Sequence, residues 1–281
     1  MRYFGCHVST SGGLARAIEN AEALGINTIQ IHACPPQRWN TKAFPVGIEG
    51  EFVAARSQSR VAKLFFHGIY LINLASLDER IYPLSQKSLI YGLDLISRME
   101  GEGIIFHLGS NKDHDDEAVG LSRAADAINR ILEQAPSGRL ILECAAGSGK
   151  IIGDKLEELA FVYERIKQKE RVGFGLDSQH MWASGYDLRE DLEGVIKQVE
   201  SILGMDKVWS VHLNDSKTEL GSKKDRHENI GDGLIGYEAL KHFFFHPKLR
   251  EIPFILETPA MATLDDAAKE VQKLHTMLEG N

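Results

Sequence analysis

Short apolar runs recur eight times along the chain, and stretches with helical spacing separate them. Strands that alternate with helices are typical of right-handed βαβ units and of a mostly parallel sheet. Eight such units in 281 residues predict a closed (β/α)8 TIM barrel that the whole chain, 1–281, forms as one domain. An open, doubly wound sheet is the alternative that the pattern leaves. The runs lie at 3–8, 28–32, 63–67, 103–107, 139–143, 172–177, 208–212 and 253–257.

The last helical stretch has the clearest pattern. Its apolar residues at 267, 271, 274 and 278 fall on one face of a helix. Thr263 is placed to cap the N-terminus, and Asp265 and Asp266 in the first turn complement the helix dipole. A second helix is predicted from the acidic cluster at 115–117 through residue 132.

Six of the apolar runs end in an ionisable residue of a type that binds metals. In a parallel barrel the C-terminal ends of the strands meet at one face, so these side chains converge in one pocket. Any one of them alone is explained as a hydrogen-bonded polar residue at a strand end. Six carboxylates and imidazoles together would repel one another and be costly to bury without cations, which predicts a metal site. The six are His67, His107, Glu143, Asp177, His212 and Glu257.

Three more candidate ligands lie close to these strand ends in the sequence. His180 follows Asp177 by three residues, and Asp225 and His227 point the same way if their segment is extended. The resulting set of five His, two Asp and two Glu suits zinc, with manganese or iron as substitutes. Nine ligands are too many for one tetrahedral ion, so two or three ions are expected. Clustered divalent ions of this kind are a common solution for phosphoryl transfer.

The composition sets limits on what the chain does. With 43% hydrophobic and 26% charged residues it is typical of a globular protein. Its net charge of −8 argues against a protein that coats nucleic acid. Three cysteines without short spacing, no long apolar run and no signal-like N-terminus favour a cytoplasmic, soluble protein. No membrane contact and no obligate protein partner are expected.

Several weaker signals are interpreted as structural. The motif GxGxxG at 231–236 does not directly follow a strand and is interpreted as a turn. Cys144 is expected to pack in the interior, and His7 is a candidate for the pocket lining. The remaining histidines are interpreted as surface or packing residues, namely His32, His114, His242, His246 and His275.

The chain resembles the endonuclease IV family of apurinic/apyrimidinic endonucleases nearly from end to end. The stretches from His212 to Lys217 and from Asp225 to Gly231 are close to diagnostic, as is Leu256-Glu257-Thr258-Pro259. Further matches are Gly5-Cys6-His7-Val8-Ser9, Tyr70-Leu71-Ile72-Asn73-Leu74-Ala75 and Leu176-Asp177-Ser178-Gln179-His180 running to Gly185-Tyr186-Asp187.

The resemblance implies three zinc ions at the C-terminal ends of the strands. His67 and His107 would hold the first ion, which Glu143 bridges to the second. The second site would be completed by Asp177, His212 and Glu257, and the third would consist of His180, Asp225 and His227. The implied reaction is hydrolysis of the phosphodiester 5′ to an abasic site, leaving a 3′-hydroxyl and a 5′-deoxyribose phosphate. Glu143 and Glu257 are the implied catalytic residues, with Glu257 also orienting the attacking hydroxide.

The implied partner is double-stranded DNA that contains abasic sites. By resemblance, Tyr70 and Leu71 are wedges that replace lost stacking at the lesion, whereas the alternative places them in a local core. A third wedge falls on either Gln37 or Arg38. Three divalent ions would bring the net charge from −8 to about −2 and place positive charge in the pocket. The basic side chains Lys217, Lys223, Lys224 and Arg226 are expected on the same face.

The chain departs from the family pattern beside three of the ligands without removing any of them. The family has Ser-Pro after the third-strand histidine, Pro after the fourth-strand histidine and Asn-Thr after the fifth-strand glutamate. Here these positions are Gly68-Ile69, Leu108 and Cys144-Ala145. Two other functions remain open: a metal-dependent sugar isomerase or epimerase of the related barrel superfamily, and a module that binds abasic DNA without cutting it. The former needs only one or two metals.

Overall fold

Eight parallel strands form a closed barrel in the computed structural model, which describes residues 2–279. The barrel closes where β1 pairs with β10, with Phe4 beside Phe254 and Cys6 beside Leu256. The predicted (β/α)8 barrel is therefore confirmed, and the open doubly wound sheet is excluded. The barrel strands are β1 (Phe4–His7), β2 (Thr28–His32), β3 (Lys63–His67), β4 (Gly103–Phe106), β5 (Leu140–Glu143), β6 (Val172–Asp177), β7 (Val208–His212) and β10 (Phe254–Leu256).

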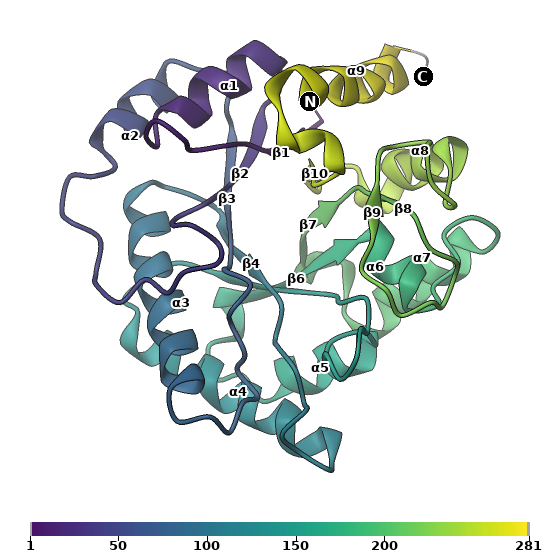
Figure 1. Ribbon diagram of the computed structural model, residues 1–281. Helices are drawn as coiled ribbons and strands as arrows, with labels where there is room; N and C mark the ends of the chain where they lie inside the picture. The colour runs from purple at the N-terminus through teal and green to yellow at the C-terminus, as the bar shows by residue number, and fades with distance from the viewer. Residues whose placement is uncertain (1, 280–281) are drawn as a thin grey trace.

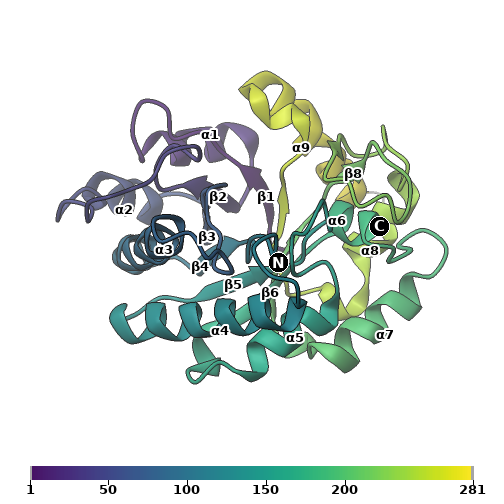
Figure 2. The ribbon, with the colours of Figure 1, turned by 60° about the horizontal axis from the view of Figure 1, so that its bottom comes forward.

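Helices surround the strands as an outer ring (Figure 1). In the rotated view, α4, α5 and α7 run next to one another along one side, in agreement with their packing contacts (Figure 2). The helices are α1 (Arg16–Leu24), α2 (Gly50–Ser57), α3 (Ile81–Arg98), α4 (Glu117–Gln134), α5 (Leu156–Glu164), α6 (Ser178–Ala183), α7 (Leu192–Ile202), α8 (Tyr237–Phe245) and α9 (Leu264–Glu279). Short 3₁₀ turns are η1 (Lys169–Arg171), η2 (Met205–Lys207), η3 (Pro247–Leu249) and η4 (Pro259–Ala262).

The two helix predictions are confirmed, and so is the predicted Thr263 cap; the cap of the first helix is a new finding. The Asp116 side chain accepts a hydrogen bond from the backbone N–H of Ala118 at the start of α4. The Thr263 hydroxyl accepts one from the N–H of Asp266 at the start of α9. Within residues 2–279, none of the helices is both long and apolar enough to cross a membrane.

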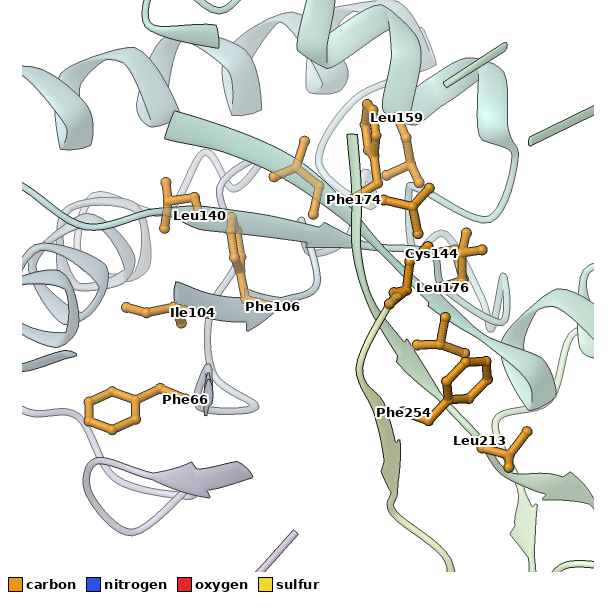
Figure 3. Close-up of a cluster of buried hydrophobic side chains, with 14 of the residues drawn as sticks. Phe66, Ile104, Phe106, Leu140, Cys144, Leu159, Phe174, Leu176, Leu213 and Phe254 are labelled. Atoms are coloured by element: carbon orange, nitrogen blue, oxygen red, sulfur yellow. The ribbon is translucent and has the colours of Figure 1, made fainter. Parts of the chain in front are cut away.

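The core has an outer and an inner layer, because successive side chains of a strand point to opposite faces. The larger layer fills the space between strands and helices and includes Phe66, Ile104 and Leu140 (Figure 3). The smaller layer lies inside the barrel and consists of Phe65, Ile105, Ile141 and Ile255.

The inner layer explains the position of the polar strand ends. On β3, His67 is two residues beyond Phe65, so both side chains point into the barrel. The same two-residue step leads from Ile141 to Glu143, and likewise from Ile105 to His107 and from Ile255 to Glu257. The polar side chains therefore lie directly above the apolar layer, toward the C-terminal end of the barrel.

A small antiparallel pair, β8 (Asp215–Ser216) and β9 (His227–Glu228), lies outside the barrel. The eight predicted runs do not include it. Figure 1 shows it beside α6 and α7, at the side of the ring where the later part of the chain lies. The loop 217–226, which joins the two strands, carries Asp225.

Candidate metal centre

Nine candidate ligands from distant parts of the chain come together at the C-terminal end of the barrel. Three overlapping groups have ligand atoms within 4.8 Å of one another. The first consists of His67, His107 and Glu143, the second of Glu143, Asp177, His212 and Glu257, and the third of Asp177, His180 and His227. Asp225, which the resemblance places in the third site, is adjacent to that group.

Glu143 belongs to two of these groups and lies between them. One carboxylate oxygen, Oε2, is 3.2 Å from His67 Nε2 and 3.3 Å from His107 Nε2. The other oxygen, Oε1, is 2.7 Å from His212 Nδ1. The side chain is fully buried on β5, so its two oxygens face two separate sets of partners. This is the geometry that a bridging carboxylate requires.

The second and third groups meet at Asp177. His212 Nδ1 is 3.1 Å from a Glu257 carboxylate oxygen and 3.8 Å from Asp177 Oδ2. On the other side, His227 Nε2 is 3.9 Å from the same Asp177 oxygen. Asp225 closes the third group, with its oxygens 3.5 Å from His180 Nε2 and 3.3 Å from His227 Nε2.

Hydrogen bonds hold four of the imidazoles with one ring nitrogen facing the centre. His67 Nδ1 donates to the carbonyl of Gly68 at 2.8 Å, His180 Nδ1 to that of Cys144 at 3.0 Å, and His227 Nδ1 to that of Glu257 at 3.1 Å. His212 donates its Nε2 proton to the side-chain oxygen of Gln30 at 2.8 Å. Histidines that ligate metals characteristically donate their other ring N–H in this way. The inward nitrogens are therefore the ones that a metal ion would bind.

One further contact is typical of a metal site. His180 Nε2 and His227 Nε2 face each other at 3.3 Å, although two nitrogen lone pairs without a proton or cation between them repel. His107 presents Nε2 to Glu143, but its buried Nδ1 has no hydrogen-bond partner among the described residues, so His107 lacks the outer hydrogen bond that the other four histidines make. Imidazole nitrogens with carboxylate oxygens and no thiolate are the donors that zinc, manganese and iron accept. The residues therefore fit divalent metal ions.

Charge compensation within the cluster shifts the pKa values of its members strongly. Burial raises the pKa of the Glu143 carboxyl, but His107 and His212 outweigh burial and hold that pKa well below its usual value. Burial lowers the pKa of His212, whereas Glu257 and Glu143 raise it, to about 9. Without cations from outside, the cluster must therefore hold protons on its own imidazoles. Metal ions would displace these protons.

Two polar residues that the sequence analysis did not single out support the ligands. The Gln30 side-chain amide donates to Glu257 Oε1 and to His7 Nδ1, while its oxygen accepts from His212. Asn214 Nδ2 donates to Asp177 Oδ2 at 2.7 Å, and Asn214 Oδ1 accepts from the N–H of Glu257 at 2.9 Å. The sequence contains a signal for the position of each. Asn214 is two residues after His212, and Gln30 alternates with buried isoleucines along β2.

His32 is one of the histidines expected at the surface or in packing, and the structure shows that it packs beside the metal centre. Its ring lies 4.6 Å from that of His7, 5.6 Å from that of His67 and 5.9 Å from that of Tyr70, measured between centroids. His32 Nδ1 also donates to the carbonyl of His67 at 3.2 Å. The alternation of β2 places Gln30 and His32 on the same face, which is why both reach the metal centre. His7 lines a separate hollow, which none of the nine candidate ligands lines, rather than the hollow over the ligands.

The expected wedge residues lie at the rim of the site. The Tyr70 and Leu71 side chains are 68% and 37% exposed, so the alternative that they form a local core is wrong. Tyr70 N–H donates to the carbonyl of Pro36 and thereby joins the two loops that carry the DNA-contact candidates. Gln37 and Arg38 are both exposed, and either one could face a substrate from this loop.

Two hollows adjoin the ligands. One of about 310 Å³ opens directly over them and is lined by His67, Tyr70, His107, His180, Asp225, His227 and Glu257. The other, of about 430 Å³, is walled in part by Gly68, Ile69 and Ala145, three of the residues that depart from the family pattern. Cys144 is buried, as expected, and its sulfur accepts the N–H of Asp177 at 3.1 Å.

The glycine-rich motif at 231–236 is a turn, as predicted, and it is also an anion cradle. Backbone N–H groups of Gly231, Gly233, Ile235 and Gly236 all donate to the carboxylate of Asp215, at 3.0–3.3 Å. A Cβ on Gly233 would lie 2.5 Å from Asp215 Oδ1, so glycine is required there. The anion that fills this cradle is the chain's own side chain, which excludes a dinucleotide phosphate at this position.

Comparison with known proteins defines the class first. Residues 18–279 match the family model described as xylose isomerase-like TIM barrel. At the level of fold alone, the structure is similar to a D-tagatose 3-epimerase-like protein, with a TM-score of 0.75 and 18% identity over 99% of this chain and 97% of the other.

Within that class the relatives are more specific. The chain is 36% identical to a probable endonuclease 4 of Clostridium botulinum (strain Alaska E43 / Type E3), over 92% of this chain and 93% of the relative. It is 38% identical to a probable endonuclease 4 of Methanoculleus marisnigri, over 91% and 92%. Endonuclease IV from Thermus thermophilus superposes with a TM-score of 0.88 and 31% identity over both full chains. The chain belongs to the endonuclease IV family of enzymes, and with its His, Asp and Glu clusters it is a metal-using member.

Proposed function

We propose that the protein is an apurinic/apyrimidinic endonuclease that uses three zinc ions. It hydrolyses the phosphodiester on the 5′ side of an abasic site in duplex DNA, leaving a 3′-hydroxyl and a 5′-deoxyribose phosphate. The observation that carries the proposal is the set of three overlapping ligand groups in which outer hydrogen bonds hold four imidazoles with one ring nitrogen facing inward. Membership in the endonuclease IV family supplies the class of substrate.

The ligands divide among three ions as the groups suggest. His67, His107 and the bridging Glu143 would hold the first, and Glu143 with Asp177, His212 and Glu257 the second. His180, His227 and Asp225 would hold the third, with Asp177 close to it. Such ions lower the pKa of bound water and neutralise charge that develops on phosphate oxygens. Manganese or iron would substitute for zinc at some of these sites.

The chain's own residues orient the ligands and receive the DNA. Gln30 and Asn214 each hydrogen bond to Glu257, one to its carboxylate and one to its backbone N–H, so this catalytic carboxylate is fixed at both ends. Tyr70 and Leu71 stand exposed beside the hollow above the ligands, where an aromatic and an aliphatic side chain can replace the missing base in the stack. Gln37 or Arg38 would enter from the neighbouring loop.

The surface charge is compatible with this substrate once the ions are present. Three divalent ions would bring the net charge from −8 to about −2 and would concentrate positive charge at the pocket. Two of the four basic residues of this face are partly neutralised, since Lys217 pairs with Glu228 and Lys223 with Asp154. We therefore expect weak binding to undamaged DNA and selective binding at the lesion.

The test is an incision assay on a 5′-labelled duplex with one abasic site, beside the same duplex undamaged. The zinc-loaded chain should release a fragment with a 3′-hydroxyl, and chelation should abolish the product. Glu257→Gln should lose incision, whereas Glu251→Gln, a change at a glutamate that is 78% exposed, should not. A chain that holds three ions and leaves the abasic strand intact would refute the proposal. About one ion per chain, with turnover of a ketose, would favour the sugar isomerase or epimerase instead.

A further inference from the structure

Asp225 differs from the other eight candidate ligands in how the fold holds it. The others lie on or directly after barrel strands, in α6 or in β9, whereas Asp225 lies in the loop 217–226. Its side chain is 52% exposed, compared with 3% for its neighbour His180. A ligand on an exposed loop must be ordered before it can bind, and that ordering has an entropic cost. Something outside the metal centre must therefore hold this loop.

The loop between β5 and α5 supplies the contacts. Lys223 Nζ lies 3.1 Å from Oδ2 of Asp154, a residue whose side chain is 9% exposed. The Ser148 hydroxyl donates to the carbonyl of Lys223 at 3.0 Å and accepts the N–H of Asp225 at 3.4 Å. We call Ser148, Asp154 and Lys223 the tether. Within the tether, Asp154 and Ser148 hold Lys223, which is two residues before Asp225, and Ser148 also holds the backbone N–H of Asp225.

The backbone at both ends of the tether is shaped for this contact. Lys223 has a φ of 53°, in the left-handed region that side-chain-bearing residues rarely adopt. Three groups of Lys223 are held: its ammonium by Asp154, its carbonyl by Ser148, and its N–H by the carbonyl of Ala183 at 2.9 Å. Gly147 has a φ of 73°, and a Cβ there would lie 2.4 Å from the Asp154 carboxylate. The two loops are therefore fitted to each other around the ion pair.

We propose that the tether positions Asp225 for the third metal ion, so that retention of this one ion depends on the Lys223–Asp154 pair. The inference rests on the proposed three-metal site. Lys223 and Asp154 are positioning residues, since neither contacts the cluster. Loss of an outer partner of a metal ligand typically weakens metal affinity 10–100-fold. Because only one of the third ion's ligands depends on the tether, we expect the lower end of that range, about tenfold.

The experiment is a zinc titration of the metal-free chain in competition with a chromophoric chelator, which gives the number of ions and the affinity of each. Lys223→Met and Asp154→Asn should each weaken one of three ions about tenfold and leave two unchanged. The double variant should be no weaker than either single variant, and Lys223→Arg should restore the affinity. Lys150→Met is the matched control: it removes the same charge from the loop that carries Ser148, and Lys150 makes no ion pair within residues 2–279.

Several outcomes would overturn the proposed role of the tether. These are unchanged zinc affinities in both single variants, an equal loss of affinity for all three ions, or a loss of affinity in Lys150→Met as large as that in Lys223→Met. A large drop in the thermal stability of the metal-free variants would overturn it too, because the pair would then hold the fold rather than the ligand. The parent is assayed for incision in parallel. Three bound ions without incision refute the proposed function alone, whereas fewer than three ions in the parent refute both.

Discussion

The Asp215 cradle allows a prediction whose size follows from its hydrogen bonds. Asp215 is fully buried, and its carboxylate accepts five backbone N–H groups, from Ser216, Gly231, Gly233, Ile235 and Gly236. In Asp215→Asn one carboxylate oxygen becomes an NH₂ group, which donates and cannot accept. Oδ2 alone receives Gly231 and Gly233, and Oδ1 alone receives Ser216 and Ile235. In either orientation at least two N–H groups lose their acceptor.

An unsatisfied buried donor costs about 1–3 kcal/mol, so two of them predict a loss of about 2–6 kcal/mol in the free energy of unfolding. The remaining bonds also lose the assistance of the negative charge. The measurement is urea unfolding of the metal-free chain in chelator, so that metal affinity does not enter the difference. Asp206→Asn is the control, because that carboxylate is 80% exposed and should change stability by less than about 0.5 kcal/mol. A loss below about 1 kcal/mol in Asp215→Asn would refute the reasoning.

Three further predictions concern the metal centre and its rim. In the metal-free chain, burial lowers the pKa of His212 but Glu257 and Glu143 raise it, to about 9, against about 6.5 in the unfolded chain. The charged His212 therefore stabilises the fold fully below pH 6.5, and this stabilisation is lost as the pH rises, so the free energy of unfolding in urea should fall by on the order of 2 kcal/mol between pH 7 and 9. A free energy of unfolding that does not change over this range would contradict the prediction. Tyr70→Ala should weaken binding of an abasic duplex about tenfold, measured by fluorescence anisotropy, with the zinc content unchanged, because it removes one stacking surface. Gln30→Ala should lower incision or zinc affinity about 10–100-fold, because His212 and Glu257 lose a shared hydrogen-bond partner that orients them. If incision and zinc affinity both equal those of the parent, Gln30 does not orient these ligands.

The barrel and the convergence of the ligands were predictable because both follow from local pattern and topology. Each apolar run is a strand, and the parallel arrangement brings the residues after the runs to one face. His67 and Glu143 also follow the two-residue step from an inward apolar residue, so even their direction is implicit in the sequence. What the pattern alone does not give is which nitrogen of each imidazole faces inward. That choice depends on carbonyl groups of other loops, such as Cys144 for His180.

Other features could not be predicted, for reasons that differ from one to the next. The Asp215 cradle joins a carboxylate to amides 16–21 residues later, and no periodicity links them. The β8–β9 pair is too short to leave a pattern, with two residues in each strand. The position of His32 beside the metal centre, by contrast, is not among the predictions although a signal for it exists. Thr28, Gln30 and His32 alternate with Ile29 and Ile31, which marks an inward polar face on β2.

The way the barrel closes has a consequence for biosynthesis. The three residues of the first metal group come from neighbouring strands of the sheet, in a segment that ends at Glu143. The second group also needs Glu257, which directly follows β10, the strand that pairs with both β1 and β7. During synthesis the proposed second site is therefore incomplete until residue 257 has been made and β10 has paired with β1 and β7. Completion of that site thus coincides with closure of the barrel.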